Sequence, residues 1–113
     1  MKKMFYVVLC SIVPCTGYAS GSSFTGTIKA VVCHANEISP VCHVEVNGAP
    51  ASASCVTSGW QYSFNGTNSE GKNFLSILLA AQMSKQTVTI GGQGTCSIAG
   101  GSEDMRHIYI STP

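Results

Sequence analysis

Short runs of apolar and β-branched residues alternate with polar positions along much of the chain, and turn residues separate these runs. Residues 24–33 and 41–46 both fit the pattern of a strand. Asn47-Gly48 follows directly and favours a two-residue hairpin turn, because both positions of such a turn need positive φ. A return strand is therefore expected over residues 52–64, with an irregularity near Ser58-Gly59.

A helical pattern replaces the strand pattern after Asn65-Gly66. Thr67 and Glu70 have the spacing of a capping box, in which the two side chains satisfy free backbone N–H groups at a helix start. We therefore expect a helix over residues 70–85. Lys85 would lie in its last turn, where a cation suits the helix dipole.

Extended structure is expected again after the helix. Residues 87–90 predict a strand, the glycine-rich run 91–94 a flexible turn, and residues 95–98 and 107–110 two further short strands. The resulting order is β-β-β-α-β-β, with the helix between the third and fourth strands. This is the order of an OB-fold, so we expect an all-β barrel with one helix.

The expected helix is apolar around more than one face. Between residues 74 and 83 only Ser76 and Gln82 are polar, whereas a helix on a single small barrel needs one apolar stripe of about 100°. The excess predicts contact with a second surface, most simply another copy of the chain; a helix covered by long loops is the alternative. The candidate contact residues are Phe74, Ile77, Leu78 and Ala81.

The first nineteen residues have the three zones of a secretory signal peptide: a basic start at Lys2-Lys3, an apolar run, and small residues ending at Ala19. We expect residues 1–19 to be removed, leaving one domain over residues 20–113 that is secreted through the periplasm. The apolar run is too short for a permanent anchor, and no later stretch reaches membrane-spanning length.

The expected mature chain is weakly charged. It has the basic residues Lys29, Lys72, Lys85 and Arg106, and the acidic residues Glu37, Glu45, Glu70, Glu103 and Asp104. A nucleic-acid binder needs a basic face, and this composition cannot supply one.

Four cysteines lie beyond the signal peptide, and an even number in an oxidising compartment indicates two disulfides. Three pairings are possible. Cys33 and Cys42 bracket a short segment that contains Pro40, as the two sides of one ribbon end would, so we expect Cys33–Cys42 and Cys55–Cys96.

Catalysis finds little support in the sequence. His34, His43 and His107 have no flanking hydrolase pattern, and the Ser-x-x-Lys spelling from Ser69 to Lys72 coincides with the expected helix start. We therefore expect no enzymatic activity and no cofactor.

The adjacent pairs Cys33-His34 and Cys42-His43 could in principle bind zinc. However, neighbouring side chains on a strand point to opposite faces, and paired cysteines oxidise readily in the periplasm. We expect no metal site.

Recognition is the remaining chemistry. Trp60, Tyr62 and Phe64 alternate along the third expected strand, and hydroxyl residues gather near the mature N-terminus. Aromatic rings that pack on sugar C–H faces, with hydroxyls that bond sugar hydroxyls, make shallow glycan sites, although these three rings can equally be core. The candidate glycan-binding residues are Ser23, Thr25, Glu45, Trp60 and Tyr62.

Two parts of the chain resemble the B subunits of bacterial toxins. Residues 73–90, followed by Cys96 and residues 100–103, resemble the helix and following strand of Shiga-type B subunits. Phe24-Thr25-Gly26, Pro40-Val-Cys42, and Ser54-Cys55 ahead of Trp60 resemble the B subunits of subtilase cytotoxin and typhoid toxin. The chain departs from the latter in being shorter after the helix and in lacking their aromatic-rich loop.

The resemblance implies an OB-fold protomer that forms a homopentamer, docks a toxin A subunit and binds a host cell-surface glycan. In the subtilase and typhoid relatives a serine of the first strand contacts the glycan, and the matching position here is Thr25. Two other hypotheses stay open. One is a monomeric periplasmic OB domain that binds a protein or peptide, as an inhibitor or envelope factor would, and the other is a zinc-binding module.

Overall fold

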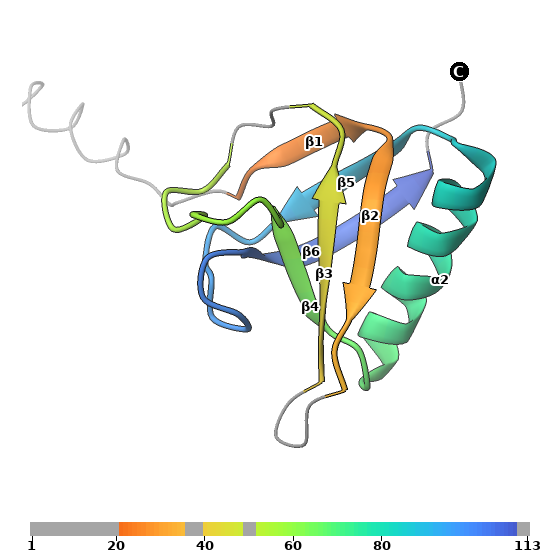
Figure 1. Ribbon diagram of the computed structural model, residues 1–113. Coiled ribbons are helices and arrows are strands. Elements are labelled where there is room, and N and C mark those ends of the chain that lie inside the picture. Colours follow the sequence, from red (N-terminus) through yellow and green to blue (C-terminus); the bar gives the residue numbers. More distant parts are fainter. Residues whose placement is uncertain (1–20, 36–39, 49–51, 111–113) are drawn as a thin grey trace, which may run out of the picture.

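The computed structural model describes residues 21–35, 40–48 and 52–110 (Figure 1). The expected signal peptide, residues 1–19, lies outside the described residues. No helix in the described ranges is long and apolar enough to cross a membrane.

Six strands and one helix form the described fold (Figure 1). The strands are β1 (Ser23–Gly26), β2 (Ile28–Cys33), β3 (Val41–Val46), β4 (Tyr62–Asn65), β5 (Val88–Gly92) and β6 (Glu103–Ile110), and the helix is α2 (Ser69–Ser84). The long first strand expected from the sequence is divided at Thr27 into β1 and β2. The expected return strand is shorter than predicted, because only its last part pairs with β3.

The six strands form one curled sheet in the order β1-β5-β6-β4-β3-β2. β1 and β2 lie at opposite ends of this order, although only Thr27 separates them in the chain. The two ends of the sheet therefore come together and produce the barrel-like shape in Figure 1. All strand pairs are antiparallel except β4–β6, which is parallel. With the helix between β4 and β5, this is the expected OB-fold arrangement.

Alternation along the strands places the core inside the curled sheet. In β3, for example, Cys42, Val44 and Val46 are buried, whereas His43 and Glu45 face outward. The helix closes one side of the barrel, and the ring of Phe74 meets that of Phe64 edge-on, with centroids 5.7 Å apart. The buried apolar residues are Phe24, Ile28, Cys42, Val44, Val46, Tyr62, Phe64, Leu78, Ala81, Val88, Ile90, Met105 and Ile108.

The helix begins one residue earlier than predicted and has a different N-cap. The side chain of Asn68 accepts from the N–H of Gly71, so Asn68 is the cap and not Thr67. Thr67 instead donates through its backbone N–H and its hydroxyl to Asn65. At the other end Lys85 is the C-cap in a left-handed conformation, with its N–H directed at the last helical carbonyls.

The chain after the helix differs most from the sequence prediction. Gly91 and Gly92 are part of β5 and not a flexible turn, and residues 95–98 are a loop and not a strand. β6 begins at Glu103, four residues earlier than expected. The glycines are accepted in the strand because side chains of β6, His107 and Glu103, fill the space where a Cβ would lie.

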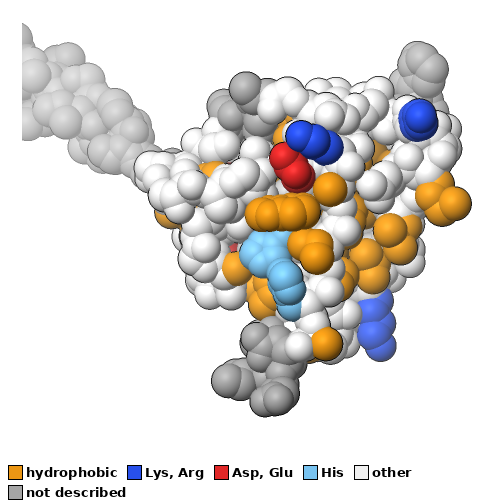
Figure 2. Space-filling model, viewed as in Figure 1, with side chains coloured by type: hydrophobic (Ala, Val, Ile, Leu, Met, Phe, Trp, Pro, Cys, Tyr) orange, Lys and Arg blue, Asp and Glu red, His pale blue; other side chains and the backbone are white. Residues whose placement is uncertain are grey.

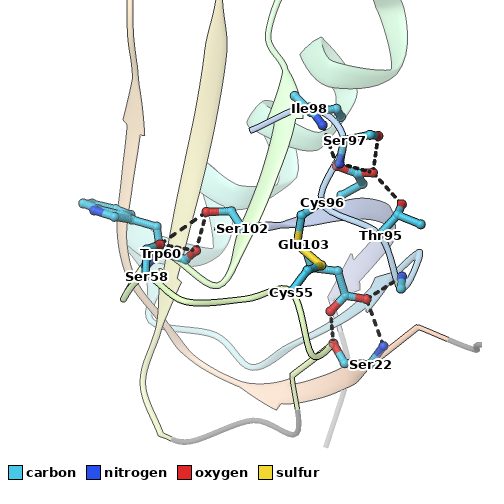
Figure 3. Close-up of a disulfide and its surroundings, with 12 residues drawn as sticks. Ser22, Cys55, Ser58, Trp60, Thr95, Cys96, Ser97, Ile98, Ser102 and Glu103 are labelled. Atoms are coloured by element: carbon cyan, nitrogen blue, oxygen red, sulfur yellow. Dashed lines mark hydrogen bonds between the residues drawn. A yellow bond between two sulfur atoms is a disulfide. The ribbon is translucent and has the colours of Figure 1, made fainter. Parts of the chain in front are cut away.

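Both predicted disulfides are present. Cys33 and Cys42 are register partners in the β2–β3 ladder, with Cα atoms 4.0 Å apart. Cys55–Cys96 joins the segment before β4 to the loop before β6, across 41 residues of sequence (Figure 3). Two disulfides are consistent with a secreted or periplasmic protein.

The two disulfides are expected to stabilise the fold unequally, because a longer closed loop loses more chain entropy. On the chain-entropy relation, replacing Cys55 and Cys96 by alanine lowers the free energy of unfolding by about 4 kcal/mol, and replacing Cys33 and Cys42 lowers it by about 2.5 kcal/mol. Chemical denaturation of the two double variants measures this difference. A larger loss for the Cys33/Cys42 variant would contradict it.

Candidate functional site

Outward side chains of β1, β5 and β6 lie in two rows across the sheet. The strand register aligns Ser23 with Gly91 and His107, and aligns Thr25 with Thr89 and Tyr109. The hydroxyl oxygens of Thr25 and Thr89 are 3.0 Å apart and share a hydrogen bond. We call this surface the strand face, and its side chains are Ser23, Thr25, Thr89, His107 and Tyr109.

Two rings form a platform on the strand face. The rings of His107 and Tyr109 are stacked, with centroids 6.1 Å apart and an interplanar angle of 26°. His107 lies directly over Gly91, since a Cβ added there would come within 2.5 Å of two atoms of the imidazole ring. Tyr109 is 54% exposed, so the platform is open to solvent.

The strand face has the chemistry of a shallow carbohydrate site. An exposed aromatic surface packs against the C–H groups of a sugar ring, and hydroxyl side chains both donate to and accept from sugar hydroxyls. The Thr25–Thr89 pair provides such hydroxyls, and Thr89 lies on the strand next to Tyr109.

The five candidate glycan-binding residues from the sequence lie in three separate places. Ser23 and Thr25 are exposed on the strand face. Glu45 points outward from β3 and forms an ion pair with Lys29, with Nζ and Oε2 3.4 Å apart. Trp60 precedes β4, and its ring lies near that of His43, which like Glu45 points outward from β3. Tyr62 is 1% exposed, because it is an inward residue of β4, so it offers no surface to a ligand.

Trp60 belongs to a second polar and aromatic group, which we call the Trp60 cluster: His34, His43, Ser58, Trp60 and Ser102. The ring centroid of His43 is 5.6 Å from that of His34 and 6.3 Å from that of Trp60. Figure 2 shows histidine and hydrophobic side chains side by side in the middle of the face. Burial, followed by the charge of His34, lowers the pKa of His43.

The hydroxyls of two serines hydrogen-bond the backbone of Trp60. The hydroxyl of Ser102 donates to the carbonyl oxygen of Trp60 at 2.6 Å, and the hydroxyl of Ser58 bonds both the N–H and the carbonyl of Trp60 at 3.1 Å (Figure 3). Ser102 Oγ also lies 3.3 Å from Nδ1 of His43. The backbone position of Trp60 is therefore held by the protein itself.

A cavity of about 250 Å³ lies between the start of α2 and the loop that follows β5, and Arg106, the residue before His107, lines it. Both apolar and polar side chains line it. The lining residues are Phe64, Asn65, Asn68, Glu70, Gly71, Phe74, Gln93, Ile98, Met105 and Arg106.

Asp104 organises the loop at one wall of this cavity. Its carboxylate accepts from the hydroxyls of Thr95 and Ser97, both at 2.6 Å, and from the backbone N–H groups of Ser97 and Ile98. Figure 3 shows these bonds converging on one carboxylate. Burial alone raises the pKa of Asp104, but the hydrogen bonds from Ser97, Thr95 and Ile98 outweigh burial and leave the pKa below its usual range.

Glu103 joins the N-terminal segment to the same region. Its carboxylate is fully buried and accepts from the N–H and hydroxyl of Ser22 and from the N–H of Gly94 (Figure 3). The hydroxyl of Tyr62 lies 3.1 Å from that of Ser22, and burial raises the pKa of Tyr62. Glu103 thus holds the start of β1 against the barrel.

Sequence reasoning missed Thr89, Arg106, His107 and Tyr109 as members of one site. The pattern of residues 107–110 predicted a strand, but it did not show which strands would pair with it. A register shift opposite Gly91 and Gly92 forms a bulge in β6 that leaves both Arg106 and His107 exposed. No sequence pattern predicts this bulge.

The candidate oligomer residues of the helix mostly face the barrel. Leu78 and Ala81 are buried in the protomer, and Phe74 and Ile77 are partly buried and pack against the core. The surface available to another copy instead carries Leu79, 43% exposed, and Met83, 85% exposed. Figure 2 shows hydrophobic side chains on the α2 side of the molecule.

In the described ranges, no three histidine, cysteine, aspartate or glutamate side chains group in a way that could hold a metal ion. No family model matches the chain, and neither the curated proteins nor the solved structures include a significant match to it.

The hydrogen bonds to Asp104 predict a specific loss of stability in acid. Because the folded-state pKa is lowered, the stabilisation is fully present above the unfolded value of about 3.9 and is lost as the pH falls through the folded value. Asp104→Asn is therefore expected to be less stable at pH 7 and to lose less stability between pH 7 and pH 2. Thermal unfolding across this range measures both effects, and parallel profiles for the two proteins would contradict the account.

Proposed function

We propose that the protein is a non-enzymatic, glycan-binding subunit of a secreted bacterial toxin, and that the strand face contacts the glycan. The observation that carries the proposal is the exposed His107–Tyr109 platform beside the paired hydroxyls of Thr25 and Thr89. Thr25 is also the position that the resemblance to toxin B subunits assigns to glycan contact. Ser23 continues the row of hydroxyls on β1.

The rigidity of the strand face supports recognition of a sugar. Its side chains come from three hydrogen-bonded strands and not from loops, and the His107 ring occupies the space that the missing side chain of Gly91 leaves. A preformed surface loses little conformational entropy on binding, which matters because a sugar on a shallow site gains little from each contact.

The proposal includes assembly as a homopentamer that docks a toxin A subunit, after export directed by residues 1–19. Leu79 and Met83 support self-association, because both are large apolar side chains on the side of α2 that faces away from the barrel. Such residues are commonly covered by a partner. Several copies in one ring would also multiply the weak affinity of a single glycan site.

A second candidate function is a monomeric periplasmic domain that binds a protein or peptide. The Trp60 cluster favours it, because tryptophan and histidine beside an ion pair resemble the aromatic, mixed-polarity surface of protein interfaces. In this case the strand face would have no ligand and Trp60 would carry most of the binding energy.

A glycan array probed with the mature, oxidised protein tests the strand face. Thr25→Ala is expected to weaken binding about fivefold, which corresponds to one hydrogen bond, and Tyr109→Ala to weaken it more by removing the exposed ring. Thr25→Ser keeps the hydroxyl and should keep most of the affinity.

The Trp60→Ala variant is the matched control, since it removes an aromatic side chain from the other group. Glycan binding that depends on Trp60 and is unaffected by Thr25→Ala and Tyr109→Ala would contradict the assignment. If a properly oxidised oligomer bound no glycan, this result would contradict the proposed function.

Sedimentation of the mature protein tests the assembly. The wild-type protein is expected to sediment as a pentamer at micromolar concentration, and Leu79→Glu with Met83→Glu to sediment as a monomer, because two charges would be buried at the contact. Asn73→Glu adds a charge at an exposed polar position of the same helix and should remain pentameric. A stable wild-type monomer would rule out the ring.

A further inference from the structure

The cavity at the start of α2 has the size of a site for one small polar ring. Its volume of about 250 Å³ is below the roughly 300–1,000 Å³ of pockets that take drug-sized molecules. Phe74 supplies an aromatic wall, and the edge-on contact with Phe64 holds its ring in place. A single pyranose unit, but not a longer saccharide, would fit this space.

Two charged side chains that line the cavity are free to bind a ligand. Within the described part of the chain, neither the guanidinium of Arg106 nor the carboxylate of Glu70 has an ion-pair or hydrogen-bond partner. Arg106 can donate to a ligand and Glu70 can accept from one. The amide of Gln93, which lines the same cavity, offers both a donor and an acceptor.

The charges around the cavity favour a neutral ligand. The lining has one cation, Arg106, and one anion, Glu70, and Asp104 lies just behind the wall, where its carboxylate accepts from the N–H of Ile98. Asp104 is a carboxylate at neutral pH, and the hydrogen bonds to it favour this charged form by lowering its pKa. The negative charges of Asp104 and Glu70 disfavour an anionic sugar, whereas the hydroxyls of a neutral sugar can accept from the arginine and donate to the glutamate.

The cavity and the strand face adjoin at the bulge in β6. Arg106 lines the cavity, and the next residue, His107, belongs to the ring platform; both are exposed because the register shifts there. A saccharide with one unit in the cavity would therefore extend directly over His107 towards Tyr109.

We propose that the cavity binds one neutral pyranose unit of the glycan and that the strand face binds the unit next to it. The preferred ligand is accordingly an oligosaccharide of at least two sugars with a neutral unit at its end. This inference rests on the proposed glycan-binding function and assigns Arg106, Glu70 and Phe74 to its first subsite.

The test uses an array that carries each neutral terminal sugar both alone on a flexible spacer and at the end of di- and trisaccharides. Arg106→Gln is expected to weaken binding of the monosaccharide and of the longer glycans by the same factor, about tenfold. Tyr109→Ala is expected to weaken binding of only the longer glycans. Lys72→Gln removes a positive charge from α2 outside the cavity and should change neither.

The outcomes separate this inference from the function on which it rests. Suppose that Tyr109→Ala weakens binding of the longer glycans, whereas Arg106→Gln, like Lys72→Gln, leaves binding unchanged. The assignment of the cavity would then be wrong, and the assignment of the strand face would be supported. Selective binding of acidic terminal sugars would overturn the neutral ligand. Absence of binding to every glycan would overturn the function itself, and matched thermal unfolding of the variants excludes misfolding as the cause.

Discussion

The rest of the structure depends on the division of the first strand at Thr27. β1 pairs with β5 at one end of the sheet and β2 pairs with β3 at the other, so one short stretch of chain must reach both ends. The sheet can satisfy both sets of backbone hydrogen bonds only by curling round. The backbone N–H of Asn47 donates to the carbonyl of Thr27 at 3.0 Å and satisfies this carbonyl at the bend.

Curling sorts the polar residues into separate surfaces. Thr25 comes to lie beside Thr89 and near Tyr109, whereas Val32, on the other half of the same predicted strand, pairs with His43 in the Trp60 cluster. Two buried carboxylates of β6 then hold two segments outside the strands in place. Glu103 holds the N-terminal segment and Asp104 holds the loop at the cavity, so the proposed sugar site is built on hydrogen bonds that the protein makes to itself.

The sequence predicted the elements better than it predicted their partners. The alternation in residues 41–46, the helix and the Cys33–Cys42 disulfide could be inferred, because strand period, helix composition and a short cysteine spacing are local signals. The Cys55–Cys96 disulfide spans 41 residues and followed only because two cysteines remained. The bulge that exposes Arg106 and His107 could not, because it depends on which strand lies opposite. Gly91 and Gly92 suggested a turn for the same reason: the side chains that replace their missing Cβ atoms come from β6.

The central claim is that the ligand lies on β1, β5 and β6 and not on the Trp60 cluster. Amide chemical shifts of the ¹⁵N-labelled protein, followed during titration with the best glycan from an array, test this claim residue by residue. The account predicts that the largest changes occur at Thr25, Thr89, Arg106, His107 and Tyr109. Changes that instead centre on His34, His43 and Trp60 would contradict it.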